Sequence, residues 1–197
     1  MHIIAGALKG RRLVTPRGAT TRPTADQVRI ALMDTLMPWL AGARVLDLFG
    51  GAGGVGLEAL SRGAGQATFV ERDGRALAAL RQNVVALGVA DRTRVVAADV
   101  ARALQRLRRE QAVFDVVFLD PPYDTDLGDV ALAGLAAAAL TAEHAVVVAQ
   151  HLTKRPPAEH VGALAAFRAR RFGETTLTFF RREDYDSGSR TEPGERI

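Results

Sequence analysis

The chain has 197 residues, 48% of them hydrophobic, and a formal net charge of +4, which suits one α/β domain with a single substantial core. It contains no cysteine, which excludes disulfides and thiolate metal sites, and its four histidines lack the spacing of paired metal ligands. Signal-peptide and membrane-span patterns are absent as well, so we expect a cytoplasmic protein without a metal.

The positive charge is concentrated at the N-terminus. Residues 1–29 carry six positive side chains and one negative side chain, net +5, which leaves −1 for the remaining 168 residues. Weak alternation around Gly6 and Gly10 predicts a β-hairpin over residues 1–14. We expect residues 1–23 to form a basic hairpin and loop that contacts a polyanion through Lys9, Arg11, Arg12 and Arg17. The alternative is a solvated basic face.

The next predicted element is a helix. Thr24 and Gln27 have the spacing of a capping box, with the threonine hydroxyl at the N-cap. Apolar residues at helical spacing follow, and Pro38 predicts that the helix ends near Met37.

From residue 44 onward, apolar strands alternate with amphipathic helices, which predicts a Rossmann-like, mostly parallel sheet. The expected strands are 44–48, 67–71, 93–97, 113–119 and 145–150, and the expected helices are 54–62, 73–87, 100–109 and 128–140. Residues 165–172 and 174–181 are predicted to close a seven-stranded sheet as an antiparallel hairpin. The main domain then covers residues 24–182, and the polar residues 183–197 are expected to form a disordered tail.

A glycine-rich turn follows the first predicted strand. Gly51, Gly53 and Gly56 match the G-x-G-x-x-G pattern, and Glu71 lies 20 residues after Gly51, where it would accept hydrogen bonds from a ribose. The pattern fits a dinucleotide as well as S-adenosylmethionine. Asp47 favours S-adenosylmethionine, because its carboxylate would repel a pyrophosphate but not a sulfonium cofactor with a cationic amino-acid end.

Acidic residues end the successive predicted strands. They are Asp47, Glu71, Asp99 and Asp120. Because ligands bind at the carboxyl edge of an open α/β sheet, this coincidence indicates function. Asp99 could accept from an adenine amine, although it could equally be the N-cap of the helix that follows.

The tetrapeptide Asp120-Pro121-Pro122-Tyr123 directly follows the apolar strand predicted at 113–119. The prolines hold an extended segment whose carbonyls accept without competing donors, Asp120 adds a carboxylate, and Tyr123 offers a face for stacking. Two acceptors around one exocyclic amine would orient its lone pair toward an electrophile. The alternative is a proline-rich turn at a strand end.

Together these segments resemble the RsmD family. The resemblance rests on Asp47-Leu-Phe-Gly-Gly-Ala-Gly53, Gly56-Leu-Glu-Ala-Leu-Ser-Arg-Gly63, Asp120-Pro-Pro-Tyr123, Arg22-Pro-Thr-Ala-Asp26 and the leading Ile3-Ile4-Ala-Gly6, and it spans residues 1 to about 182. It implies an S-adenosylmethionine-dependent methyltransferase fold and methylation of the N2 amine of a guanine in bacterial small-subunit ribosomal RNA, free or in a partly assembled particle. A monomer that does not bind membranes is expected. Ile30, Met33-Asp34, Gly50 and Ala52 depart from the family pattern around the first helix and the glycine loop.

The resemblance also implies roles for individual residues. Residues placed around the cofactor are Arg22, Thr24, Asp47, Phe49, Gly51, Gly53, Glu71 and Asp99. Residues placed around the guanine are Asp120, Pro121, Pro122 and Tyr123. The basic hairpin would contact RNA.

Three other functions compete with this one. An adenine-N6 DNA methyltransferase uses a similar Asp-Pro-Pro-Tyr element, but so short a chain leaves no room for a target-recognition domain. A dinucleotide-dependent oxidoreductase is disfavoured by Asp47 and by the absence of an acid/base candidate for hydride transfer. The third alternative is a non-catalytic RNA-binding assembly factor.

Overall fold

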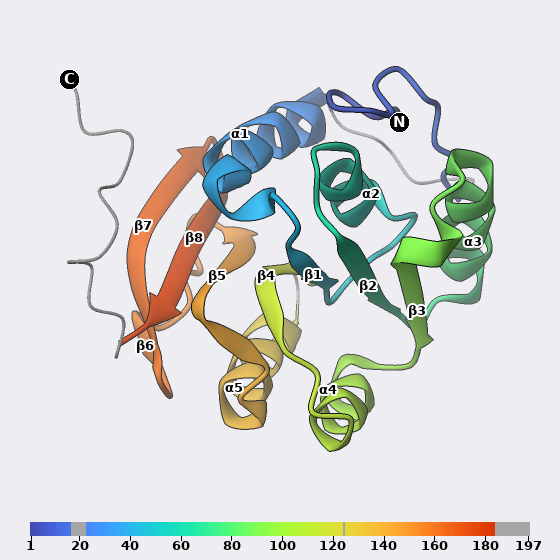
Figure 1. The fold of residues 1–197 in the computed structure, drawn as a ribbon. Coiled ribbons are helices and arrows are strands. Elements are labelled where there is room, and N and C mark those ends of the chain that lie inside the picture. Colours follow the sequence, from blue (N-terminus) through green and yellow to red (C-terminus); the bar gives the residue numbers. More distant parts are fainter. Residues whose placement is uncertain (17–22, 124, 184–197) are drawn as a thin grey trace.

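The computed structural model describes residues 1–16, 23–123 and 125–183, and Figure 1 shows their arrangement around one sheet. The sheet has the strand order β3-β2-β1-β4-β5-β8-β7-β6. The strands are β1 (Arg44–Asp47), β2 (Gln66–Glu71), β3 (Thr93–Ala97), β4 (Phe114–Leu119), β5 (Thr141–Leu152), β6 (His160–Val161), β7 (Leu164–Phe172) and β8 (Thr175–Arg182). The first five are parallel, and β8, β7 and β6 extend the sheet in antiparallel pairs.

Helices cover both faces of the sheet, as expected for parallel strands that are apolar on both sides. They are α1 (Pro23–Leu40), α2 (Gly54–Ser61), α3 (Gly74–Leu87), α4 (Val100–Arg109) and α5 (Leu127–Ala138), with a 3₁₀ turn at Ala90–Arg92. Two apolar clusters result: α1, α2 and α3 pack on one face, and α4 and α5 on the other (Figure 1). In the described part of the chain, no helix is both long and apolar enough to cross a membrane.

The sequence predicted the alternating elements and the C-terminal hairpin, with four main differences. The strand β5 begins four residues before the predicted start, and the two-residue strand β6 makes the sheet eight-stranded among the described residues. Helix α1 begins at Pro23, so Thr24 lies in its first turn rather than at its N-cap. The same helix continues through Pro38 to Leu40, although Pro38 cannot donate a hydrogen bond to the preceding turn; burial of Leu40 in the core offsets that loss.

The N-terminal segment, residues 1–16, reverses direction as predicted but does not form two strands. An isolated antiparallel bridge joins His2 and Arg12, and Ile3 N donates to Arg11 O at 2.9 Å. Gly6 has a φ of +82°, which turns the chain toward α2, where a side chain at this position would collide with the Ser61 carbonyl. The arms therefore bond to α2 rather than only to each other.

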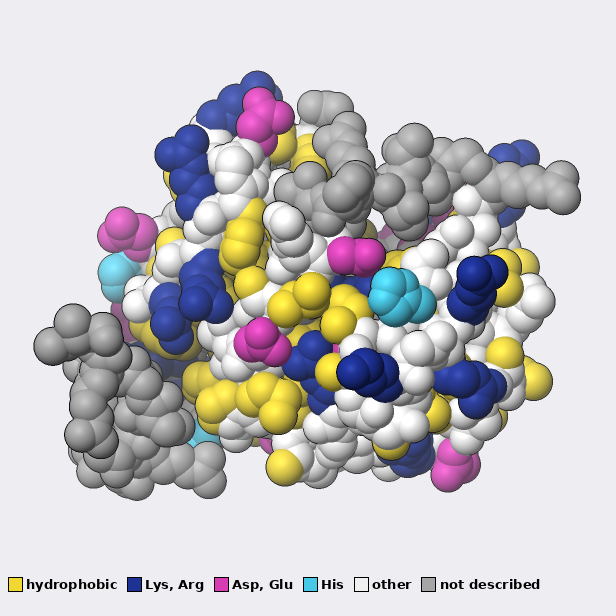
Figure 2. All heavy atoms as spheres, turned by 90° about the horizontal axis from the view of Figure 1, so that it is seen from above, with side chains coloured by type: hydrophobic (Ala, Val, Ile, Leu, Met, Phe, Trp, Pro, Cys, Tyr) yellow, Lys and Arg dark blue, Asp and Glu magenta, His cyan; other side chains and the backbone are white. Residues whose placement is uncertain are grey.

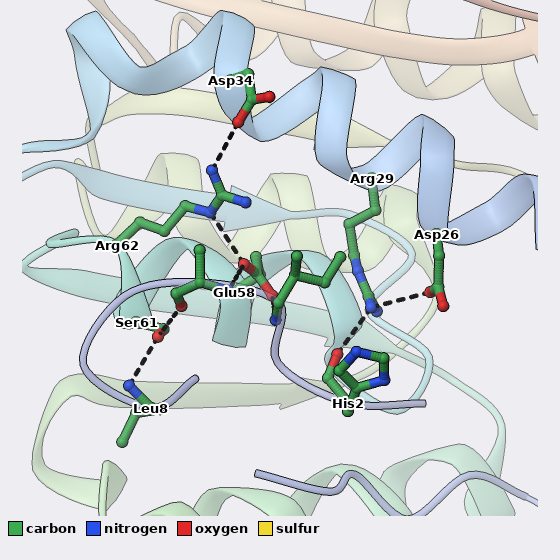
Figure 3. A network of polar contacts seen from close by, with 10 residues as sticks. His2, Leu8, Asp26, Arg29, Asp34, Glu58, Ser61 and Arg62 are labelled. Atoms are coloured by element: carbon green, nitrogen blue, oxygen red, sulfur yellow. Dashed lines mark hydrogen bonds and ion pairs between the residues drawn. The ribbon is translucent and has the colours of Figure 1, made fainter. Parts of the chain in front are cut away.

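Buried charges fasten this segment to α2 and α1 (Figure 3). Glu58 is fully buried, and its carboxylate accepts from Ile4 N at 2.7 Å, from Ala5 N at 3.0 Å and from Arg62 Nε at 2.9 Å. Arg29, on α1, donates to the His2 carbonyl at 2.8 Å. The N-terminal segment is thus part of the domain and closes over the helix that follows the glycine-rich turn.

Candidate active site

The site lies where the direction of strand order reverses. The chain runs outward from β1 to β2 and β3 and then returns to place β4 beside β1, so a crevice opens at the carboxyl ends of β1 and β4. The predicted carboxylates follow one another along this edge in the order Asp99, Glu71, Asp47, Asp120. The structure therefore brings together residues that are up to 73 positions apart in the sequence.

The glycine-rich turn leads from β1 into α2 at close quarters. Gly53 is the N-cap of α2 with a φ of 91°, and a Cβ there would lie 2.7 Å from the side chains of Leu57 and Leu80. Gly56 packs against the ring of Phe69, where a Cβ would approach to 2.4 Å. Only glycine fits at positions 53 and 56, so the backbone of the turn packs directly against the core, and no side chain of these two residues occupies the space on the ligand side.

Asp47 is buried with too few partners for a carboxylate. Its side chain is 2% exposed, Oδ2 accepts from Gly56 N at 3.3 Å, and Oδ1 is buried with no hydrogen-bond partner among the described residues. Burial raises the pKa of Asp47 to about 7, and the charge of Asp120 acts in the same direction. An orphaned carboxylate oxygen behind the glycine-rich turn fits a ligand that brings a cation or hydrogen-bond donors.

Glu71 and Asp99 serve the backbone as well as the cavity. Glu71 accepts from Gly51 N at 2.8 Å and from the amides of Arg72 and Asp73 at 2.7 and 2.8 Å. Asp99 caps α4 by accepting from Arg102 N at 3.0 Å. A carboxylate has about four acceptor positions, so both groups keep capacity for a ligand hydroxyl or amine.

A cavity of about 710 Å³ lies along this edge and continues between α4 and α5. Seven of the predicted residues line it: Phe49, Glu71, Asp99, Asp120, Pro121, Pro122 and Tyr123. Apolar side chains supply most of the remaining wall, including Leu48, Val70 and Leu104. Its size and its few convergent polar groups suit a nucleoside-like ligand.

The Asp120-Pro-Pro-Tyr element separates this cavity from a second one of about 320 Å³, which is also lined by Gln150 and His151. Burial raises the pKa of Asp120 to about 7, opposed by a hydrogen bond from Tyr123. The Tyr123 hydroxyl also accepts from Gln150 Nε2 at 2.7 Å. The element thus carries a carboxylate near its titration midpoint at neutral pH, with a tyrosine between two polar partners.

Comparisons with known proteins place this chain in a family. Residues 1–181 match the family described as Conserved hypothetical protein 95. YlbH of Bacillus subtilis, named as a candidate rRNA methyltransferase, is 34% identical over 92% of this chain and 99% of its own length. The ribosomal RNA small subunit methyltransferase D of Haemophilus influenzae is 36% identical over 67% of this chain and 68% of its own.

The protein belongs to the RsmD family. The solved structure of yhhF from Escherichia coli, described as a candidate methyltransferase, is 31% identical and covers 93% of this chain and 98% of its own, with a TM-score of 0.82. The fold is that of the S-adenosylmethionine-dependent methyltransferases, as the sequence predicted.

Some residues implied by the RsmD resemblance lie away from the cavity or outside the described chain. Asp47, Gly51 and Gly53 support the turn from behind and do not line the cavity, and the Gly51 amide is already bonded to Glu71. Arg17 and Arg22 lie outside the described residues, as does the side chain of Thr24. The disordered tail predicted for residues 183–197 lies outside them except for residue 183.

The predicted phosphate contacts are on the N-terminal segment, apart from the cavity. Lys9 and Arg12 are exposed, whereas the exposed Arg11 donates to the Ala86 carbonyl on α3. On the face shown in Figure 2, lysine and arginine side chains are spread among hydrophobic and acidic ones rather than gathered in one block. The solvated-face alternative therefore stays open.

Sequence reasoning missed two polar residues that support the site. Asn83, on the apolar face of α3, donates to the Ala52 carbonyl in the glycine-rich turn at 2.9 Å and binds both the N–H and the carbonyl of Val14. Gln150, at the end of β5, reaches Tyr123. A polar residue among buried leucines and valines was a usable signal for Asn83; a strand-end glutamine is too common to single out Gln150.

Proposed function

We propose that this protein transfers a methyl group from S-adenosylmethionine to the N2 amine of a guanine in bacterial small-subunit ribosomal RNA. The observation that carries the proposal is the pair of buried, interacting carboxylates at the ends of the neighbouring strands β1 and β4. These are Asp47 and Asp120, and Asp120 lines the large cavity. Membership of the RsmD family and the small-subunit rRNA methyltransferase name of a relative support the substrate.

The residues present fit the cofactor. S-adenosylmethionine would supply an electrophilic methyl group on a sulfonium. Its cationic amino group would be favoured by the negative charge that Asp47 can carry behind the glycine-rich turn. Its ribose suits the one spare acceptor position of Glu71, and its adenine suits the wall that contains Asp99. A dinucleotide would instead bring a pyrophosphate toward several carboxylates, which disfavours the oxidoreductase alternative.

The Asp120-Pro-Pro-Tyr element would handle the target amine. A base inside a duplex is inaccessible, so the guanine would be flipped out and held against the element. The Asp120 carboxylate and the Pro121 carbonyl would accept from the amine and orient its lone pair, so that catalysis is mainly positioning. Because its pKa is about 7, Asp120 could also accept a proton that the amine loses after transfer.

The N-terminal segment would contact the RNA backbone. Lys9 and Arg12 project from it into solvent, and its network with Glu58 and Arg29 holds it rigidly against the domain. Phosphate contacts from such a platform would orient the substrate without reading its sequence.

One assay tests the proposal. Unmodified small-subunit rRNA, both free and in partly assembled particles, is incubated with methyl-labelled S-adenosylmethionine and then digested to nucleosides. We expect label in N2-methylguanosine. Label in N6-methyladenosine would overturn the guanine assignment, and binding of the RNA without methylation of either substrate would favour the assembly-factor alternative. Isothermal titration with S-adenosylmethionine and with NAD separates methyltransferase from oxidoreductase.

A further inference from the structure

The hydroxyl of Tyr123 lies between two side chains that come from neighbouring strands. The β4–β5 register pairs Leu119 with Ala149, so Asp120 and Gln150 are the next residues on adjacent strands. Gln150 Nε2 donates to the Tyr123 hydroxyl at 2.7 Å, and the Tyr123 hydroxyl bonds to the Asp120 carboxylate. Three side chains therefore form one chain that ends at the carboxylate of the proposed site.

The chemistry of these groups sets the direction of the chain. An amide nitrogen only donates, whereas a phenol has one proton to donate and lone pairs to accept. Because Gln150 fills an acceptor position of the hydroxyl, the single proton of Tyr123 is directed to Asp120. Hydrogen bonds that polarise one another in this way strengthen each other.

We propose that Gln150 is a positioning residue for Asp120 and acts through the hydroxyl of Tyr123. The chain keeps one Asp120 oxygen satisfied and the carboxylate ionised and oriented, so that it can accept from the target amine. This inference rests on the proposed function, and it gives the tyrosine hydroxyl a role in addition to the stacking expected of its ring.

The surroundings of Asp120 make such support necessary. From β1 and β2, the groups nearest the edge are the carboxylates of Asp47 and Glu71. The other charged or titratable groups in the walls of the two cavities are Arg72, Asp99, Arg108, Asp126, Asp129, His151 and Arg155. Burial opposes ionisation of Asp120, and the hydrogen bond from Tyr123 favours it.

The test compares Gln150→Leu, Tyr123→Phe and the double variant with the unaltered protein, using Gln82→Leu on the exposed face of α3 as the matched control. Methyl transfer is measured from pH 6 to pH 9. We expect the acidic limb of the turnover profile to move to higher pH by on the order of one unit in Gln150→Leu, which is about a tenfold loss at pH 6. Much of this loss should disappear at pH 9, where the carboxylate is ionised in every variant. Affinity for S-adenosylmethionine should change less than about twofold, since Gln150 lies outside the large cavity.

Two further results decide the mechanism. The double variant should be no slower than Tyr123→Phe, because a chain cut at one link is not weakened by cutting the next. In the cofactor-free protein, carbon-13 NMR of the Asp120 carboxyl should show a higher pKa in both single variants. Additive losses, a pH-independent loss, or an unchanged Asp120 pKa would each overturn the inference. If the unaltered protein methylates no rRNA, the proposed function fails, whereas the NMR titration still tests the hydrogen-bond chain.

Discussion

Two regions of this protein bury carboxylates, and they treat them in opposite ways. Beneath the N-terminal segment, Glu58 is 0% exposed and accepts from two backbone amides and from Arg62. At the strand edge, Asp47 is 2% exposed and has no charged partner: backbone amides of Gly56, at 3.3 Å, and Phe49 are the groups that favour its ionised form, and Oδ1 meets no hydrogen-bond criterion among the described residues. A buried charge with all its partners holds structure together, whereas one left without them is available to a ligand or a reaction.

Breaking the satisfied region should have the largest effect on stability. Glu58→Ala removes one partner from a buried ion pair. It leaves two amides unpaired and leaves Arg62 with only its ion pair to Asp34, so we expect a loss of about 3–5 kcal/mol in the free energy of unfolding. Urea denaturation measures it. The matched control is Glu143→Ala, whose side chain is exposed, and an equally small loss in both variants would contradict the structural role of Glu58.

The strand edge should show the converse pattern, with a large loss of activity and little loss of stability. Asp120→Ala removes an acceptor for the target amine, and we expect turnover to fall by about 10²–10³-fold while cofactor affinity is largely kept. Single-turnover methyl transfer and isothermal titration separate the two effects. The control is Asp91→Ala, which changes an exposed aspartate on the 3₁₀ turn. If Asp120→Ala kept the turnover of the unaltered protein, Asp120 would have no part in the proposed mechanism.

The raised pKa of Asp47 should also appear in the pH dependence of stability. The pKa of Asp47 is about 7 in the folded protein against an ordinary 3.8, so the folded state binds the proton more tightly than the unfolded state. Stability from this group is complete below pH 4 and is lost as the pH rises through 7, by roughly 2–4 kcal/mol. Denaturation of Asp47→Asn from pH 4 to pH 8 should show a flatter curve than the unaltered protein. If the stability of Asp47→Asn changed with pH as steeply as that of the unaltered protein, another group would bind the proton that we assign to Asp47.

Asn83 links the two regions and should produce an intermediate effect. Its side chain bonds Val14 of the N-terminal segment and Ala52 of the glycine-rich turn. Asn83→Ala therefore leaves a buried carbonyl unpaired at Ala52 and part-buried backbone groups unpaired at Val14. We expect a loss of about 1–3 kcal/mol in unfolding free energy and weaker cofactor binding. Hydrogen exchange should locate the loosening in residues 50–54 as well as near Val14. Protection lost at only one of these places would show that the regions are independent.

The smallest effect is expected on the outer face of the N-terminal segment. Lys9→Ala and Arg12→Ala remove exposed charges without touching the Glu58 network. If these side chains contact phosphates, each change should reduce the salt dependence of rRNA binding by a slope of about 1, with cofactor affinity unchanged. An unchanged slope would favour the solvated-face interpretation.

The strands and most of the helices were predictable because their signals are local. Apolar runs such as Val116–Leu119 and the glycine spacing around Gly53 each lie within a few residues, and the carboxylates were recognisable as the residues that end these runs. Some boundaries differed, such as the end of α1, which lies beyond Pro38. Such boundaries depend on whether one more helical turn can bury side chains against residues that are distant in the sequence.

The sequence by itself determined the α/β class, the strand-end carboxylates and the Asp120-Pro-Pro-Tyr element, since each depends on residues close together in the chain. Only the tertiary structure decided which buried charges are satisfied. Glu58 meets Ile4 across 54 residues, Asn83 meets Val14 across 69, and Gln150 meets Tyr123 across 27. Partners so far apart are chosen by how strands and helices pack, and local sequence patterns contain no record of that packing.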